Sequence, residues 1–237
     1  MIGSKFIVKR GRREEAEKPF WISFADLMSA LVVLFLVVMG VALLSVTQTV
    51  TEIQSVEDIH KVKIQTILDH FEAASASYEG ITIHRDRHAI DFGARAQFAF
   101  GTWQLSAEQE SVLRQFVPEI LKIANDELGK DILKRVVIEG YTDKTGSYLT
   151  NLNLSLQRSQ KVLCSMFATS GPNLLDDSQK ADVRNLFFVG GYSFNAAKES
   201  DEESRRVEMR LEFRGINEEP RSTPTHIDDN FGECALR

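Results

Sequence analysis

Asp26 is the one ionisable residue in an apolar stretch that runs from residue 20 to residue 46. A carboxyl group inside a membrane costs about 3 kcal/mol to insert, and such groups usually mark a proton or ion pathway. Ser23, Ser29 and Ala30 lie three or four positions away, so a helix places them on the same face as Asp26. We therefore predict that Asp26 carries an ion and that these neighbours line its path. The alternative is that Asp26 reaches the membrane surface or only hydrogen-bonds a partner helix.

The stretch around Asp26 is long enough to cross a membrane as a single helix. At ~1.5 Å of rise per residue, residues 20–46 form a helix of roughly 40 Å, against a hydrocarbon core of about 30 Å. A cleaved signal peptide is the alternative, but this apolar run is about twice as long as that of a signal peptide and contains a carboxylate. Because one helix cannot enclose an ion path, we expect further helices from a partner and from a second copy of this chain.

Basic residues lie on one side of the predicted membrane helix. After it, no Lys or Arg occurs before Lys61. The basic side of a membrane helix stays in the cytoplasm. We therefore predict a cytoplasmic arm over residues 1–19 and a periplasmic location, outside the inner membrane, for the chain from about residue 47 onward. The basic residues before the helix are Lys5, Lys9, Arg10, Arg12, Arg13 and Lys18.

The rest of the chain divides by its hydrophobic pattern. Residues 47–80 contain apolar residues at spacings of three and four and no proline, and glycine occurs only at the end, which predicts a helical linker. Residues 81–215 alternate strand and helix signals in the order β-α-β-α-β-β, where the first strand signal is either a strand pair or one long strand. This order predicts an α+β sandwich with helices on one face of a mixed sheet. Residues 216–237 form a polar tail.

Composition excludes several classes of protein. The chain has 237 residues, a net charge of −6, 43% apolar residues and two cysteines, which excludes a disordered chain and a disulfide-stapled miniprotein. The acidic balance argues against a nucleic-acid partner. The histidines show no metal-ligand spacing, and neither a nucleophile–base set nor a phosphate-binding glycine loop occurs, so we expect no metal, no cofactor and no enzyme. Cys164 and Cys234 would lie in an oxidising compartment, either as a disulfide that fixes the tail or as separate thiols.

The stretch from Gly140 to Val162 carries a motif of polar residues at fixed spacing. It resembles the peptidoglycan-binding motif of the OmpA C-terminal-like family, and the resemblance extends over residues 81–215. The Phe-rich segment before the first helix and the Arg205-Arg206 pair match the opening and closing segments of that family, and we expect both arginines to be mainly structural. The motif positions are filled by Thr142, Asp143, Gly146, Asn151, Leu154, Ser155 and Arg158.

This resemblance implies peptidoglycan binding by Thr142, Asp143, Asn151, Leu154 and Arg158. A stem peptide contains a diamino acid with ammonium and carboxylate groups, and charge-assisted or bidentate contacts to such groups are the strong ones. Asp143 would hold the ammonium and Arg158 the carboxylate. Asn151 would add neutral hydrogen bonds, and Leu154 would pack on the methylenes. The alternative is an internal salt bridge between Asp143 and Arg158, with Thr142 and Asp143 in an ordinary turn.

The segment from Pro19 to Val38 has a resemblance of its own. It is similar to the transmembrane helix of the MotB-type stator subunits, in which an aromatic-rich entry precedes an ion-carrying acid. Asp26 matches that acid, and Ser29 stands where threonine is common. The residues around Asp26, the short N-terminal arm and the compact length resemble most the ZorB family, the MotB-like subunits of Zorya anti-phage defence systems.

The resemblance to MotB implies an ion-driven rotary motor. Two copies of this chain would lie within a pentamer of a larger ZorA- or MotA-like multi-helix membrane subunit. Passage of H⁺ or Na⁺ by way of Asp26 would turn the pentamer, while peptidoglycan holds this chain still. The alternatives are a flagellar MotB-type stator subunit and a passive OmpA-like envelope tether without ion transport.

Overall fold

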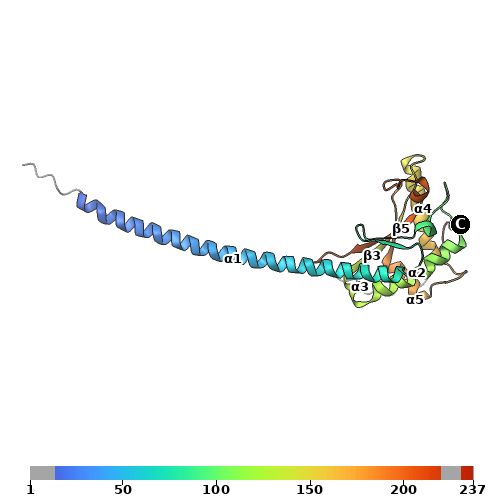
Figure 1. The fold of residues 1–237 in the computed structure, drawn as a ribbon, viewed down its shortest axis with the longest axis horizontal. Coiled ribbons are helices and arrows are strands. Elements are labelled where there is room, and N and C mark those ends of the chain that lie inside the picture. The colour runs from blue at the N-terminus through green and yellow to red at the C-terminus, as the bar shows by residue number, and fades with distance from the viewer. Residues whose placement is uncertain (1–13, 220–230, 237) are drawn as a thin grey trace, which may run out of the picture. The chain divides into compact units, whose positions relative to one another are not determined.

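The computed structural model describes residues 14–219 and 231–236, and it divides the chain into two compact units, residues 1–57 and 58–237 (Figure 1). Most of the predicted cytoplasmic arm and half of the predicted tail lie outside the described residues. Helix α1, Glu14–Ser75, begins in the first unit and ends in the second. Each unit is described by itself below.

The first unit consists of the N-terminal part of α1. Its described side chains, from Trp21 onward, are exposed, and most of those up to Val46 are apolar. By length and composition, α1 is suited to cross a membrane, in agreement with the helix predicted over residues 20–46.

The second unit contains a five-stranded sheet in the order β1-β2-β5-β3-β4. Neighbouring strands are antiparallel, except that β3 and β4 are parallel. The sheet is therefore mixed, as predicted, and the first strand signal is a strand pair. The strands are β1 (Thr82–His84), β2 (Ala89–Asp91), β3 (Leu133–Gly140), β4 (Phe187–Gly191) and β5 (Val207–Phe213).

Helices connect these strands and bury their apolar faces against the sheet, which confirms the α+β class. Ser106 and Gln109 form a reciprocal capping box at the start of α2, and Ser147 caps α4 through the backbone N–H of Thr150. Three short helices, α3, α5 and α6, were not expected from the hydrophobic pattern. α3 and α6 are too short to show a period, and α5 is mostly polar, with only two buried residues. The helices are η1 (Gly93–Ala96), α2 (Ala107–Asn125), α3 (Glu127–Ile132), α4 (Tyr148–Met166), α5 (Asp177–Leu186) and α6 (Asp201–Ser204).

The core of the second unit begins earlier in the chain than the predicted domain start at residue 81. Ile67, Leu68 and Phe71 of α1 are fully buried in the same apolar cluster as Phe116 of α2 and Ile138 of β3. The spacing of three and four residues in this segment predicts a helix with one apolar face. That face packs on the domain, so the last turns of α1 belong to the domain core and are not a separate linker.

The sheet face opposite to the core carries paired charges. Arg210 of β5 donates two hydrogen bonds to Glu139 of β3, at 2.6 and 2.9 Å, and Arg135 of β3 pairs with Glu212, which lies directly opposite on β5. Glu208 of β5 is buried and is paired with two arginines. Burial of a carboxylate requires such partners, because an unpaired buried charge is strongly destabilising.

Close packing at Gly140, the last residue of β3, positions α4 against the strand. A Cβ atom at this residue would lie 1.9 Å from the backbone oxygen of Ser155 in α4. We expect Gly140→Ala to lower the free energy of unfolding by about 3 kcal/mol, because forced overpacking displaces backbone. Thermal and denaturant unfolding measure this change. Gly215→Ala is the matched control, since nothing lies within 4 Å of its added Cβ. Equal stability of the two variants would contradict this contact.

Candidate functional site

A cavity of about 280 Å³ opens where the end of β3, the start of α4 and the loop before α2 meet. β3 leads into Thr142 and Asp143, while α4 contributes residues one turn apart on one face, because side chains three or four positions apart lie together. The loop contributes Phe100 and Trp103. The structure thus brings together all the residues predicted to bind peptidoglycan: Thr142, Asp143, Asn151, Leu154 and Arg158.

Asp143 is 4% exposed and is held on both carboxylate oxygens. Its Oδ1 accepts a hydrogen bond from the backbone N–H of Thr145 at 2.9 Å, and its Oδ2 lies 3.2 Å from Nη1 of Arg205. Burial would raise the pKa of Asp143, but these hydrogen bonds and the Arg205 charge outweigh it, so the pKa of Asp143 is lowered. Asp143 is therefore a fixed anionic group beside the cavity.

Arg158 is fully buried, and its guanidinium donates to backbone oxygens. Nε donates to Thr102 at 3.0 Å, Nη1 to Tyr141 at 2.7 Å and Nη2 to Ala99 at 3.3 Å. The guanidinium also lies 5.0 Å from the ring centre of Phe98, a cation–π contact. Burial lowers the pKa of Arg158 to about 10, so the side chain stays cationic at neutral pH.

This arrangement differs from the two roles that the sequence suggested for Arg158. The salt-bridge alternative paired it with Asp143, but the arginine that pairs with Asp143 is Arg205. The second role was that Arg158 binds a ligand carboxylate through its guanidinium. The guanidinium is only partly available for this role, because three of its five N–H groups donate to backbone oxygens of the protein. Arg158 therefore joins the end of β3 to the loop before α2. Its buried positive charge lies at the wall of the cavity.

Thr142 and Asn151 complete the inner wall of the cavity. The Oγ1 of Thr142 is buried and makes no hydrogen bond to any residue that the structure describes. A buried hydroxyl without a partner is costly, so this atom is suited to bond a ligand. Asn151 donates its Nδ2 to the backbone oxygen of Thr145 at 2.9 Å. This bond holds the turn at Gly146, whose φ of +101° favours glycine.

Comparison with known proteins covers both the domain and the whole chain. The model of the OmpA family matches residues 97–205, a range that includes every residue lining the cavity. The Zorya protein ZorB of Escherichia coli O139:H28 is 43% identical over 221 residues, which cover 92% of this chain and 90% of that protein. This chain belongs to the ZorB family.

Two further matches are more distant. A second Zorya protein ZorB, from the Crooks strain of Escherichia coli, is 24% identical over 236 residues, 87% of this chain and 93% of that ZorB protein. The crystal structure of the periplasmic domain of MotB matches with a TM-score of 0.39 and 13% identity, over 54% of this chain and 65% of that domain.

Arg205 is a residue of this ZorB-family site whose role the sequence did not reveal. It was expected to be mainly structural, and it does donate its Nε to the backbone oxygen of Phe98 at 3.1 Å. Its Nη1, however, holds Asp143. The signal in the sequence was the place of Arg205 in the closing segment of the OmpA family. That signal did not reveal its partners, Asp143 and Phe98, because they lie 62 and 107 residues earlier in the chain.

The predicted ion-path residues lie on α1 in the first unit. Asp26 is exposed, and so are Ser23 and Ala30. Ser29 donates its hydroxyl to the backbone oxygen of Asp26 at 2.8 Å, so this hydroxyl bonds the helix backbone three residues earlier. Their role in ion passage remains a prediction for this member of the ZorB family.

Cys164 of α4 and Cys234 are joined by a disulfide, with their Cα atoms 5.6 Å apart. The bond spans 70 positions of sequence and fastens the described end of the tail to the domain. Of the two alternatives that the sequence left open, the structure contains the bonded one.

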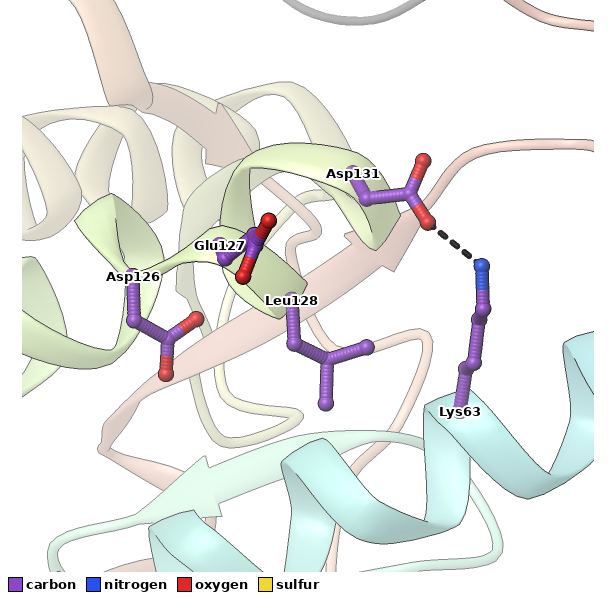
Figure 2. Close-up of a pocket in the computed structure, with 5 residues that line it drawn as sticks. All are labelled: Lys63, Asp126, Glu127, Leu128 and Asp131. Carbon is purple, nitrogen blue, oxygen red and sulfur yellow. Dashed lines mark hydrogen bonds and ion pairs between the residues drawn. The ribbon is translucent and has the colours of Figure 1, made fainter.

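A second cavity lies between the last turns of α1 and α3 (Figure 2). Lys63 of α1 reaches across it to Asp131 of α3, with Nζ 2.7 Å from Oδ2. Asp126 caps the start of α3 by accepting from the backbone N–H of Gly129. Asp126 and Asp131 therefore have structural partners. The ion pair of Lys63 with Asp131 fastens this part of α1 to α3.

Proposed function

We propose that this chain is the peptidoglycan-anchored stator subunit of an ion-driven rotary motor in the inner membrane, acting in Zorya anti-phage defence. The observation that carries the proposal is the 43% identity to ZorB over 92% of the chain, a range too long to be confined to the OmpA-like domain. The chain combines an apolar helical stretch, residues 20–46, that contains one acid with a domain whose cavity is lined by a fixed anion, a buried cation and a hydroxyl that has no partner among the described residues.

The proposed wall contact uses the chemistry of the cavity. Asp143 binds the ammonium group of the stem-peptide diamino acid, because charge-assisted hydrogen bonds to a fixed carboxylate are strong. The N–H groups of Arg158 that are left over after its three hydrogen bonds to described residues, together with its charge, attract the carboxylate of the diamino acid. Thr142 gains through its Oγ1 the hydrogen bond that it lacks within the described chain. Leu154 packs on the methylenes between the two charged ends.

The proposed ion path centres on Asp26, with Ser23, Ser29 and Ala30 on the same helix face. Two copies of α1 lie inside a pentamer of a ZorA-like subunit, and Asp26 takes up and releases an ion, most simply a proton. One charge that moves through 100 mV releases about 2.3 kcal/mol, so repeated passage can do work. We place the domain in the periplasm, and the disulfide of Cys164 and Cys234 supports this location because disulfides form in an oxidising environment.

Sedimentation with purified sacculi tests the wall contact. We expect the full chain in detergent to pellet with sacculi and Asp143→Asn to stay in the supernatant, because the amide loses the charge that binds ammonium. Asp177→Asn is the matched control, since the side chain of Asp177 is 87% exposed on the domain surface and should not affect pelleting. Equal pelleting of Asp143→Asn and wild type would remove the site assignment.

The pH dependence of pelleting gives a second readout of the same prediction. The pKa of Asp143 is lowered, so Asp143 remains ionised through the ordinary Asp pKa of about 3.9 and loses its charge only as pH falls further. Arg205→Gln removes one cause of the lowered pKa. The acid limit of binding should therefore move to higher pH in this variant. An unchanged acid limit would show that Arg205 does not tune Asp143.

A further inference from the structure

Ser193 lies in the loop after β4, and it is fully buried although it is polar. It does not line the cavity. Its φ is +54°, in the left-handed region that residues other than glycine seldom adopt. Such a conformation persists where the surrounding contacts fix it, and it is typical of functional sites. The contacts that fix Ser193 come from the two segments that form the inner wall of the cavity.

Three hydrogen bonds join Ser193 to these two segments. Its backbone oxygen accepts from the N–H of Thr142 at 2.9 Å. Its backbone N–H donates to the Oγ of Ser155 at 3.1 Å, and its own Oγ donates to the backbone oxygen of Tyr148 at 3.2 Å. Thr142 follows the end of β3, whereas Tyr148 and Ser155 belong to α4. Ser193 therefore bridges the segment after β3 and the first half of α4.

The direction of the Thr142 side chain follows from the alternation along β3 and the residues after it. Successive side chains of an extended chain point to opposite faces. Glu139 and Tyr141 share the outer face of the sheet, where the hydroxyl of Tyr141 donates to Glu139 at 2.6 Å. Gly140 and Thr142 therefore face α4, and Gly140 lies against the backbone of Ser155. This alternation directs the side chain of Thr142 to the cavity, which it lines.

The Oγ1 of Thr142 is the group whose position depends on the bridge made by Ser193. This hydroxyl has no hydrogen-bond partner among the described residues and lies at the cavity. Its position is set by the backbone of Thr142, whose N–H is held by the backbone oxygen of Ser193. A group that is fixed before the ligand arrives binds more tightly, because less freedom is lost on binding. A fixed backbone at Thr142 therefore favours a hydrogen bond from its hydroxyl to a ligand.

We propose that Ser193 is a positioning residue that holds the hydroxyl of Thr142 toward the ligand in the cavity. The inference rests on the proposed function and adds to it a residue that acts on the cavity from outside. Ser193 does not touch the ligand. Its hydroxyl fixes the loop after β4 to Tyr148, and its backbone oxygen then holds Thr142. Loss of the Ser193 hydroxyl releases the loop, so the Oγ1 of Thr142 no longer has one fixed position.

Calorimetric titration of the full chain in detergent with the free stem tripeptide that ends in the diamino acid tests this role. Ser193→Ala removes the hydroxyl that fixes the loop, and Thr142→Val removes the Oγ1 but keeps the branched shape. We expect each variant to raise the Kd of the tripeptide about fivefold, the effect of losing one neutral hydrogen bond. Because Ser193 acts through Thr142, the double variant should bind no more weakly than Thr142→Val alone.

Ser165→Ala is the matched control for the loss of a buried hydroxyl. Ser165 is 3% exposed on α4, its hydroxyl donates to the backbone oxygen of Val162 at 2.7 Å, and it does not line the cavity. This variant should lower the unfolding temperature as Ser193→Ala does and keep the wild-type Kd, because a purely structural hydroxyl does not change the affinity of the folded protein.

The double-mutant cycle separates the failure of this inference from the failure of the proposed function. An unchanged Kd in Ser193→Ala overturns the positioning role, and additive losses in the double variant overturn its action through Thr142. In both cases tripeptide binding by wild type still supports the proposed function. If Ser193→Ala does not fold, Ser193→Gly, which adopts the positive φ without strain, takes its place in the cycle. Failure of wild type to bind the tripeptide overturns both.

Discussion

We expect the replacement of Asp26 by Asn to abolish the protection that the proposed defence system gives to cells against phage, so that plaque formation returns to the level of cells without the system. Asn has the shape of Asp but cannot take up and release a proton. If Asp26 carries the ion, the energy of about 2.3 kcal/mol per charge and 100 mV is then no longer available to the motor. Counting plaques on cells that carry the wild-type or variant system measures the effect.

We expect this loss of protection to come from lost ion passage and not from failed assembly of the membrane complex. Asp26→Asn should reach the membrane in normal amounts and co-purify with the proposed multi-helix partner subunit, because the amide is less costly to bury than the carboxylate. Asp58→Asn is the matched control, since the side chain of Asp58 is 77% exposed outside the apolar stretch. Full protection by Asp26→Asn would leave only a passive tether.

We expect the replacement of Arg158 by Ala to remove sacculus binding and to lower the free energy of unfolding by about 3 kcal/mol. The variant leaves the backbone oxygens of Ala99, Thr102 and Tyr141 without their donor, and each unsatisfied buried group costs about 1–3 kcal/mol. Because two of these oxygens belong to the loop before α2, the loop should also lose its fixed position. Denaturant unfolding measures the first effect, and co-sedimentation below the unfolding transition measures the second.

Arg114 provides a matched control for that loss of stability. It is 2% exposed, and it likewise donates to backbone oxygens, those of Pro172 and Ser165, but it does not line the cavity. Arg114→Ala should therefore destabilise the domain by a similar amount and still pellet with sacculi. If both variants pellet as wild type does, Arg158 has no part in wall binding; if both fail, the effect is one of folding alone.

The resemblance to the OmpA C-terminal-like motif identified the candidate site residues, and these residues meet in one cavity because they lie close together along the chain. Thr142 and Asp143 end a strand, and Asn151, Leu154 and Arg158 follow on the next helix, so one strand–helix connection brings them to one place. The hydrophobic pattern likewise predicted the mixed sheet and its covering helices.

The hydrogen-bond partners within the site could not be predicted in this way. Arg158 donates to residues 56 and 59 positions earlier, and Asp143 pairs with Arg205, 62 positions later. Such pairs depend on how the loop before α2 and the segment just before β5 meet, which local spacing does not specify. The burial of Ile67 and Phe71 was missed for a related reason, since an apolar helix face has the same spacing whether it packs on its own domain or on another chain.

The charges on the outer face of the sheet have a consequence for strand alignment. Glu208, Arg210 and Glu212 alternate in sign at every second residue of β5, and Arg135 of β3 lies opposite Glu212. A slip of β5 by two residues would keep every apolar side chain on the correct face. It would place Arg135 opposite Arg210, and it would move Glu139 from opposite Glu208 to opposite Arg206. Like charges directly opposite one another are destabilising. Each register therefore contains one like-charge pair, but only the native register keeps Arg135 beside Glu212 and Arg210 beside Glu139, so these two ion pairs favour the native alignment of β5.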